Sequence, residues 1–184
     1  MELYDLILER LLKESSGKER PKRTSYFGYY GQPSVRWGNN RSLKSYDGNK
    51  KVRVSNSHVV VDKSGFLIAI MVTVAHIHDS KAVLLLMRVL KECFHSIKVI
   101  IADGGYSGKI IREVKNKFGY LLQIVLSKDS SEKSFQPVHK RWIVERTFAW
   151  FDNDRRLCRN YELLMESSEE MVKLSAIKLL LNKI

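Results

Sequence analysis

The stretch IKVIIADGGYSG, residues 97–108, constrains the fold of this chain more than any other. A short apolar run, broken over 97–102 only by Lys98, is typical of a buried strand, and the paired glycines after it allow a sharp turn. Asp103 stands between the two, at the tip of the predicted strand. Because ligands of open α/β sheets collect at the carboxyl ends of strands, Asp103 is a candidate ligand-binding residue. Alternatively, it only caps a helix that begins near Ser107.

A second carboxylate stands in the stretch KRWIVERTFAWF, residues 140–151, within a helical pattern that runs over about 139–157. Apolar neighbours such as Phe148 predict that this helix is largely buried, and a buried glutamate is costly unless it is paired or binds a cation. Glu145 follows Arg141 by four residues, so an ion pair along one helix face is one explanation. The other is metal binding, because carboxylates that meet can hold Mg²⁺ ions that act on phosphodiester bonds.

Charge and hydropathy narrow the classes of partner. The 184 residues are 44% hydrophobic, enough for one core, and 32 Lys and Arg against 20 Asp and Glu give a net charge of +12. So basic a chain favours nucleic acid or an acidic membrane surface, although a basic protein with neither partner stays an alternative. No apolar run approaches the roughly 20 residues of a membrane span, and the start lacks a basic leader. We therefore expect a cytoplasmic chain without membrane partners.

The order of predicted elements indicates an α/β fold. Amphipathic spacing predicts a helix over 2–13, then a polar linker, while 36–49 is rich in turn residues and 62–65 reads as a tight hairpin turn. Strands are predicted over 25–30, 51–61, 66–74, 97–102 and 121–126. Helices are predicted over 79–94 and 107–117, and a capping-box pattern at Ser167 and Glu170 predicts a last helix that runs to the end. Three antiparallel strands followed by parallel ones predict a ribonuclease-H-like mixed sheet flanked by helices.

Arginines gather in and after the predicted helix that carries Glu145. They are Arg141, Arg146, Arg155, Arg156 and Arg159. A planar guanidinium makes two parallel hydrogen bonds to a phosphate, so this excess of Arg over Lys favours contact with DNA over an ordinary solvated face. Trp142, Trp150 and Tyr161 lie among them and could stack on unpaired bases or pack in the core.

The histidines do not predict a metal site. His76, His78 and Asp79 are close in sequence, but successive strand residues point to opposite faces, so at most two of them converge. His58 and His139 are predicted to be ordinary surface or phosphate-proximal histidines.

Three segments together make the chain resemble the DDE transposases of bacterial insertion sequences, from about Tyr26 to the end. They are HVVVDKSGFLIAIMVTVAHIHDS, IIADGGYSG and HKRWIVERTFAWFDNDRRLCRNYE. The resemblance implies a catalytic domain in which Asp103 and Glu145 supply the second and third carboxylates of a two-metal site for Mg²⁺ or Mn²⁺. It also implies that the arginine-rich stretch after Glu145 holds DNA. Lys50, Lys51 and Arg53, in a region that is more basic in the family, are further predicted DNA contacts.

The chain departs from the family at the first carboxylate. Related chains read Asp-Ser-Gln-Ser-Val-Lys at the tip of the first strand, whereas this one reads Gly-Gln-Pro-Ser-Val-Arg over 31–36. Matching the Ser-Val pair places the catalytic aspartate position on Gly31. Since glycine has no side chain to bind a cation, the two-metal site is predicted to be incomplete. Asp47 is the nearest acidic residue that follows, in a turn-like context, and is a weak substitute.

Domain organisation and function follow from the same resemblance. Residues 1–24 are interpreted as a helix and basic linker left from a longer N-terminal portion, and 25–184 as the DDE catalytic domain. The leading hypothesis is a DNA transposase, with metal-dependent phosphodiester cleavage and strand transfer at element ends, that is impaired in this copy by Gly31. The alternatives are a catalytically silent DNA-binding protein, an inhibitor in mixed oligomers with an intact transposase, a nuclease with a relocated carboxylate, or a product without a present role. Nucleoid association is expected when DNA is bound.

Overall fold

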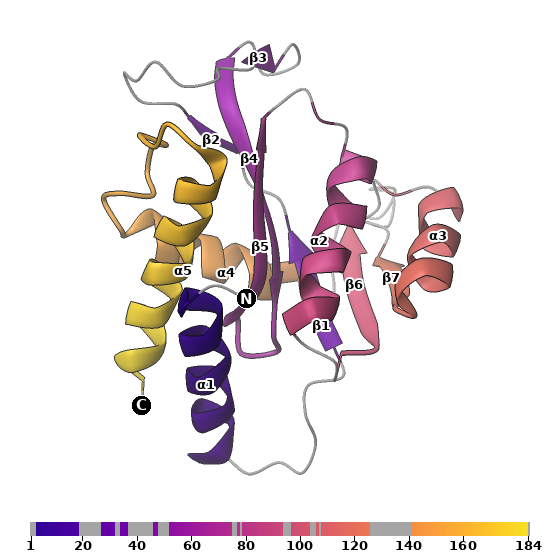
Figure 1. Cartoon of the computed structure of the whole chain (residues 1–184), viewed down its shortest axis with the longest axis horizontal. Coiled ribbons are helices and arrows are strands. Elements are labelled where there is room, and N and C mark those ends of the chain that lie inside the picture. The colour runs from indigo at the N-terminus through magenta and orange to yellow at the C-terminus, as the bar shows by residue number, and fades with distance from the viewer. Residues whose placement is uncertain are drawn as a thin grey trace, which may run out of the picture.

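The computed structural model describes residues 3–18, 27–31, 34–36, 46–47, 52–74, 77, 79–93, 97–103, 106, 108–125 and 141–183. Figure 1 shows the arrangement of its elements. In chain order they are α1 (Leu3–Lys18), β1 (Phe27–Gly31), β2 (Ser34–Arg36), β3 (Tyr46–Asp47), β4 (Val52–Val61), β5 (Leu67–Val74), α2 (Asp79–Cys93), β6 (Val99–Asp103), α3 (Gly108–Phe118), β7 (Leu121–Val125), α4 (Arg141–Asp152) and α5 (Met165–Leu181).

The strands form one mixed sheet with β1 at its centre. β4 pairs antiparallel with both β1 and β5, and β6 pairs parallel with both β1 and β7. The resulting order is β5–β4–β1–β6–β7, and the short β2 and β3 pair with β4 beyond the end of β1. This arrangement confirms the prediction of three antiparallel strands followed by parallel ones.

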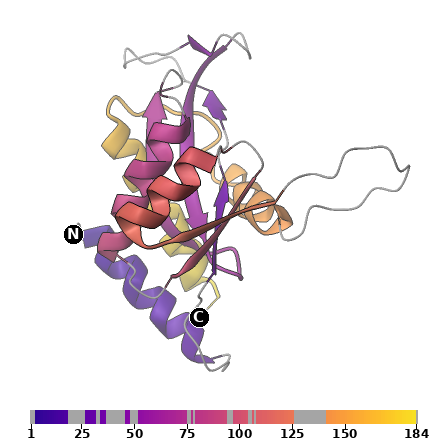
Figure 2. The ribbon, with the colours of Figure 1, turned by 90° about the vertical axis from the view of Figure 1, so that its right-hand side faces the viewer.

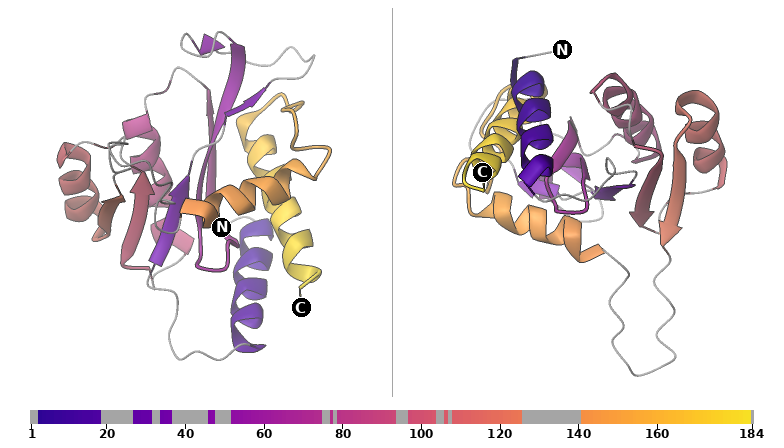
Figure 3. Two further views of the ribbon diagram at one scale, coloured as in Figure 1. Left: turned by 180° about the vertical axis from the view of Figure 1, so that it is seen from behind. Right: turned by 90° about the horizontal axis from the view of Figure 1, so that it is seen from below.

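Helices cover both faces of the sheet (Figures 2 and 3). Because successive strand residues point to opposite faces, β1 contributes to two cores. Tyr29 packs with residues of α1, α4 and α5, whereas Tyr30 packs with residues of α2 and α3. Within the described part of the chain, no helix is long and apolar enough to cross a membrane.

The predicted hairpin turn between β4 and β5 is confirmed. Asp62 Oδ1 accepts the backbone N–H groups of Ser64 and Phe66, each at 2.8 Å, and Gly65 adopts a φ of +82° that suits glycine. Burial raises the pKa of the Asp62 carboxyl, although these hydrogen bonds oppose the shift. The turn lies at the amino end of β1, since the preceding Val61 pairs with Tyr29.

Both ends of the chain depart from the predictions. α1 continues to Lys18, through residues predicted as a linker, and its Leu8 and Leu12 are buried in the core of α4 and α5. The capping box predicted at Ser167 is wrong, because α5 already begins at Met165 and Ser167 lies inside it. The domain boundary predicted after residue 24 falls outside the described residues and stays a prediction.

Two further differences lie around the site. The region 36–49, predicted as a long turn, contains β3, and β2 (Ser34–Arg36) ends at its first residue; both strands pair with β4. The helix predicted to reach Leu157 ends at Asp152. Asn153 there donates its side-chain amide to the Ala149 carbonyl at 3.0 Å, and Asp154 Oδ1 accepts the Arg156 N–H at 3.3 Å. Short polar side chains that bond nearby backbone in this way favour turns over helix.

Candidate active site

The carboxyl ends of β1 and β6 meet at one edge of the sheet. Phe27, Gly28 and Tyr29 pair with Val99, Ile100 and Ile101 in parallel register. The same register continued by two residues sets Gly31 beside Asp103, the last residue of β6. The sequence assigned these two positions to the first and second carboxylates, and the register brings them together.

Helix α4 lies directly over Gly31. A Cβ atom added there would overlap Cγ1 of Val144 and would lie 3.2 Å from Cε2 of Phe148. Glu145, the third predicted carboxylate, is the next residue after Val144 along this helix. The three predicted positions therefore lie on elements that converge at the carboxyl end of β1.

The opposite flank of α4 is fixed to the turn between β4 and β5. Thr147 donates its hydroxyl to the Gly65 carbonyl at 2.7 Å, and Arg146 donates to the Ser64 carbonyl at 2.6 Å. Glu145 and Thr147 point about 200° apart around the helix, so Glu145 lies on the side away from that turn. Phe148, which lies against Gly31, projects about 60° from Glu145 around the helix, so the flank of Glu145 is the one nearer to Gly31. Glu145 is exposed, so the prediction of a buried glutamate is wrong.

Arg146 is engaged inside the protein. Its guanidinium carbon lies 4.7 Å from the ring centroid of Trp142 and 4.8 Å from that of Trp150. A guanidinium held between two rings and bonded to the Ser64 carbonyl fixes α4 to the turn. The role of Arg146 in DNA contact stays a prediction, but its contacts point to a positioning role.

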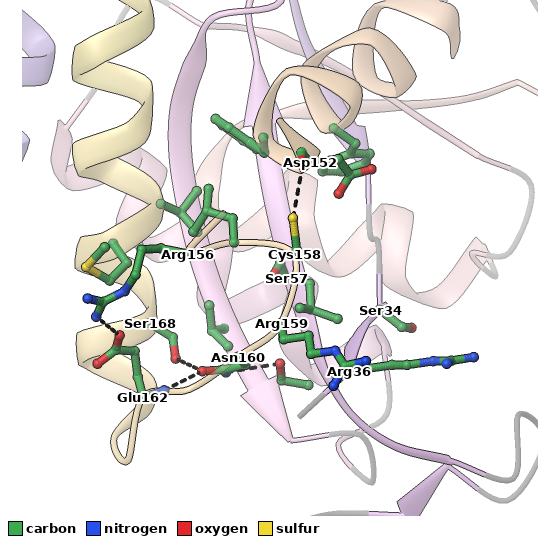
Figure 4. Close-up of a pocket in the computed structure, with 18 of the residues that line it drawn as sticks. Ser34, Arg36, Ser57, Asp152, Arg156, Cys158, Arg159, Asn160, Glu162 and Ser168 are labelled. Atoms are coloured by element: carbon green, nitrogen blue, oxygen red, sulfur yellow. Dashed lines mark hydrogen bonds and ion pairs between the residues drawn. The ribbon is translucent and has the colours of Figure 1, made fainter. Parts of the chain in front are cut away.

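A pocket of about 250 Å³ opens beside Glu145's flank of α4 (Figure 4). Asp152, seven residues after Glu145 and so on the same flank, lines it together with residues of β2, β4 and α5. Arg36, Arg156 and Arg159 bring positive charge to its walls. Arg156 is paired with Glu162 at 2.6 Å, whereas Arg36 and Arg159 are exposed at their side chains. The pocket therefore combines an apolar floor with charged walls that suit an anion.

Asn160 holds the arginine-bearing loop in place. Its side-chain amide donates to Ser55 Oγ at 3.2 Å, and its Oδ1 accepts the Ser168 hydroxyl at 2.9 Å and the Glu162 N–H at 3.0 Å. Its backbone N–H also donates to the Arg36 carbonyl at 2.8 Å, which brings Arg159 next to Arg36 (Figure 4). Sequence reasoning missed both Asn160 and Arg36, and only the position of Asn160 beside the arginines could have drawn attention to it.

The other predicted contacts are less fully placed. Arg155 is exposed just after α4. Arg53 lies on β4 opposite Tyr46, with only its backbone described, and the same holds for Arg141 at the start of α4. Lys50 and Lys51 lie outside the described residues. All five stay predictions as DNA contacts.

Asp47 is remote from the predicted site. It belongs to β3 and pairs with Val52, whereas Gly31 pairs with Val59, seven positions further along β4. At about 3.3 Å per residue, the two sites on β4 are roughly 23 Å apart. This separation argues against Asp47 as a substitute for the first carboxylate.

The described residues do not fit a two-cation site. Among them no group of three or more His, Cys, Asp or Glu side chains could hold a metal ion. Gly31 offers no ligand, and Val144 fills the space into which a side chain there would extend. The chain retains Asp103 and Glu145, but at the first of the three predicted ligand positions a methyl group of Val144 occupies the space of a side chain.

His58 is a structural residue, so the prediction that it lies at the surface is wrong. It is 0% exposed, with Nδ1 2.8 Å from the Tyr30 hydroxyl and Nε2 2.9 Å from Thr73 Oγ1. Both ring nitrogens are therefore used within the sheet. His76, His78 and His139 lie outside the described residues.

Comparisons with known proteins agree with this arrangement. Residues 27–176 match the family described as the transposase DDE domain. The protein assigned as the transposase of insertion sequence element IS402 from Burkholderia cepacia is 29% identical over 115 residues, covering 59% of this chain and 54% of that protein. This chain thus spans about half the length of that relative.

One solved structure supports the fold. A chain of the simian T-cell lymphotropic virus intasome, solved with the PP2A regulatory subunit B56 gamma, superposes with a TM-score of 0.53 at 12% identity, covering 85% of this chain and 50% of that one. The catalytic domain of the Mos1 mariner transposase gives 0.44 at 10% identity, with 100% of this chain and 92% of that one covered. The mixed sheet is ribonuclease-H-like, as predicted. With its sheet order, its converging site positions and a family match over 27–176, the chain belongs to the transposase DDE domain family.

Proposed function

We propose that this chain is an insertion-sequence transposase domain that binds DNA but is impaired in cutting it. One observation carries the proposal. The carboxyl ends of β1 and β6 and the overlying α4 bring together Gly31, Asp103 and the helix of Glu145, with glycine at the first position. An arginine-lined pocket adjoins the same flank of α4.

The DNA-binding part of the proposal follows from charge and geometry. Arg36 and Arg159 are both exposed, and their backbones are adjacent because the N–H of Asn160 donates to the Arg36 carbonyl. Arg155 is exposed in the same loop as Arg159. Guanidinium groups bind phosphate oxygens through paired hydrogen bonds, and the net charge of +12 attracts a polyanion. The DNA backbone is the polyanion that a transposase domain handles. We therefore assign the pocket wall to phosphate contact.

The impairment follows from the missing ligand. Intact members of such a family are expected to hold two cations, which stabilise the attacking and leaving oxygens of a phosphodiester. Here two of the three predicted carboxylate positions are retained, and the residues that the structure describes do not fit that site. We therefore expect the chain to bind DNA without cleaving it. A chain of this kind could also inhibit an intact transposase by forming mixed oligomers with it, which stays an alternative function.

The salt dependence of DNA binding tests this proposal. We would measure the affinity for a short duplex by fluorescence anisotropy between 50 and 200 mM salt, where each neutralised phosphate contributes about −0.9 to the log–log slope. Arg36→Gln and Arg159→Gln should each weaken binding and flatten the slope by about that amount. Arg88→Gln is the matched control, since Arg88 is exposed on α2 and pairs with Glu92 at 3.7 Å. A flat salt response of the native chain would remove the assignment.

A further inference from the structure

Helix α4 packs so closely against Gly31 that no residue other than glycine fits at position 31 without a shift. A Cβ there would overlap Val144 Cγ1, and two ring carbons of Phe148 would lie at 3.2 and 3.3 Å. Contacts of this kind are relieved only if a neighbour moves. The identity of residue 31 therefore decides how close α4 can lie to β1.

Neither Val144 nor its helix can move away at little cost. Valine is β-branched, with a single preferred rotamer in a helix, and Val144 is 6% exposed. α4 itself is held on its other side by the bonds of Thr147 and Arg146 to the turn between β4 and β5. Its residues Ile143 and Phe151 are buried in the same core. Well-packed interiors of this kind respond to added atoms with strain.

We propose that residue 31 and Val144 compete for one space, so that the first carboxylate and the present position of α4 exclude each other. An aspartate at position 31 can enter only if Val144 is made smaller or if α4 moves away from β1, carrying Glu145 with it. Val144 is thus a positioning residue for Glu145. The metal part of this inference rests on the proposed function, whereas the steric part does not.

A double-mutant cycle in thermal unfolding tests the steric part without DNA or metal. Gly31→Ala should lower the melting temperature by about 3–10 °C, as overpacked cores do. In the Val144→Ala background the same change should cost much less, because the overlap with Cγ1 is gone and only the contacts with Phe148 at 3.2 and 3.3 Å remain. Additive effects of the two substitutions would overturn the proposal.

Two glycines of the same chain serve as controls for that cycle. Gly28→Ala would clash with Val60 Cγ1 at 2.7 Å, so it should also destabilise, but Val144→Ala should not relieve it. Gly108→Ala has nothing within 4 Å and should leave the melting temperature unchanged or slightly raised. Relief of the Gly28 clash by Val144→Ala would count against a local competition at position 31.

A Mn²⁺ titration followed by electron paramagnetic resonance tests the metal part. The double variant Gly31→Asp, Val144→Ala should bind Mn²⁺ several-fold more tightly than Gly31→Asp alone. Equal, tight binding by both would overturn the role of Val144. If neither variant binds better than the native chain while the stability coupling holds, the steric inference stands and the assignment of Gly31 as the first-carboxylate position fails.

Discussion

Gly31 and Asp103 end neighbouring parallel strands at the same level of the sheet. In a ribonuclease-H-like fold this edge is where acidic side chains can meet a ligand, and here one of the two strands ends without a side chain. The chain therefore keeps the framework of the proposed site, with glycine at the position that we assign to its first ligand.

Asn160 should contribute to both stability and DNA affinity. Asn160→Ala removes its bonds to Ser55, Ser168 and Glu162 and leaves buried polar atoms without partners, so the free energy of unfolding should fall by about 2–3 kcal/mol. DNA affinity should fall as well, although no charge changes, because the loop carrying Arg159 loosens. We would measure stability by urea unfolding and DNA affinity by fluorescence anisotropy. Asn153→Ala, which removes one exposed hydrogen bond to the Ala149 carbonyl, is the control in both measurements. Equal effects of both substitutions would contradict the account.

Glu169 should make stability fall as pH rises towards neutrality. Burial raises the pKa of its carboxyl from 4.5 to about 7, against the Val72 N–H bond and the charge of Lys173, while Glu166 and Glu170 add to the rise. The folded state therefore holds a proton that the unfolded state has lost between those two pH values. The contribution of protonated Glu169 to the free energy of unfolding is therefore complete below about pH 4.5. It is lost as the pH rises to about 7, and the loss is at most about 3 kcal/mol.

Substitution of Glu169 checks that pH dependence. Glu169→Gln keeps an oxygen for the Val72 N–H, which the native carboxylate accepts at 2.8 Å, and removes the charge. We expect a flatter profile of unfolding free energy between pH 4.5 and 7 and a gain in stability at pH 8. Glu92→Gln, at a side chain 70% exposed on α2, should leave the profile unchanged. Parallel profiles for native and Glu169→Gln proteins would refute the assignment.

Lys173 should be required for the contact between α1 and α5. Burial alone would lower the pKa of its ammonium, but the hydrogen bonds and charges of Asp5 and Glu170 outweigh burial and raise it. It lies 2.8 Å from Asp5 on α1 and 2.7 Å from Glu170. Lys173→Met leaves two partly buried carboxylates without their cation, so we expect a loss of about 3 kcal/mol in urea unfolding. Lys178→Met, at an exposed 3.7 Å pair with Asp154, should cost far less.

Trp142 should raise the affinity of the chain for single-stranded DNA more than its affinity for duplex DNA. It is 52% exposed at the start of α4, and Arg146 packs against its ring, so an open face is held ready for stacking. Stacking on one base is worth about 1–3 kcal/mol, so Trp142→Ala should weaken binding of a short single strand by about 5- to 100-fold. Trp142→Phe should retain most of the affinity. An unchanged single-strand affinity of Trp142→Ala, measured by anisotropy, would assign this tryptophan to packing alone.

The sequence predicted the fold well because strands β1, β4, β5, β6 and β7 are strongly apolar and separated by clear turn signals. It also placed Asp103 at a strand end, because an apolar run precedes it, whereas Gly31 was assigned only by matching Ser34 and Val35 to the family's motif. It did not predict β2 and β3, which are short and depend on pairing with β4 rather than on their own composition. The network around Asn160 was equally out of reach, since it joins Ser55 and Ser168 across the fold.

Burial was the least predictable property. Glu145 was expected to be buried because its neighbours are apolar, but helical geometry turns it away from Val144 and into solvent. His58 was expected at the surface because it is polar, but Tyr30 and Thr73 satisfy both its nitrogens inside the sheet. The position around the helix decides the exposure of Glu145, and the tertiary partners decide the burial of His58.

The most direct test of the central claim is plasmid nicking by the native chain in the presence of Mn²⁺, with DNA binding measured on the same samples. We predict that the native chain binds the plasmid and leaves it intact, because Gly31 cannot supply the first ligand. Nicking by the native chain that disappears in Asp103→Asn would contradict this account, since it would require a complete cation site despite Gly31.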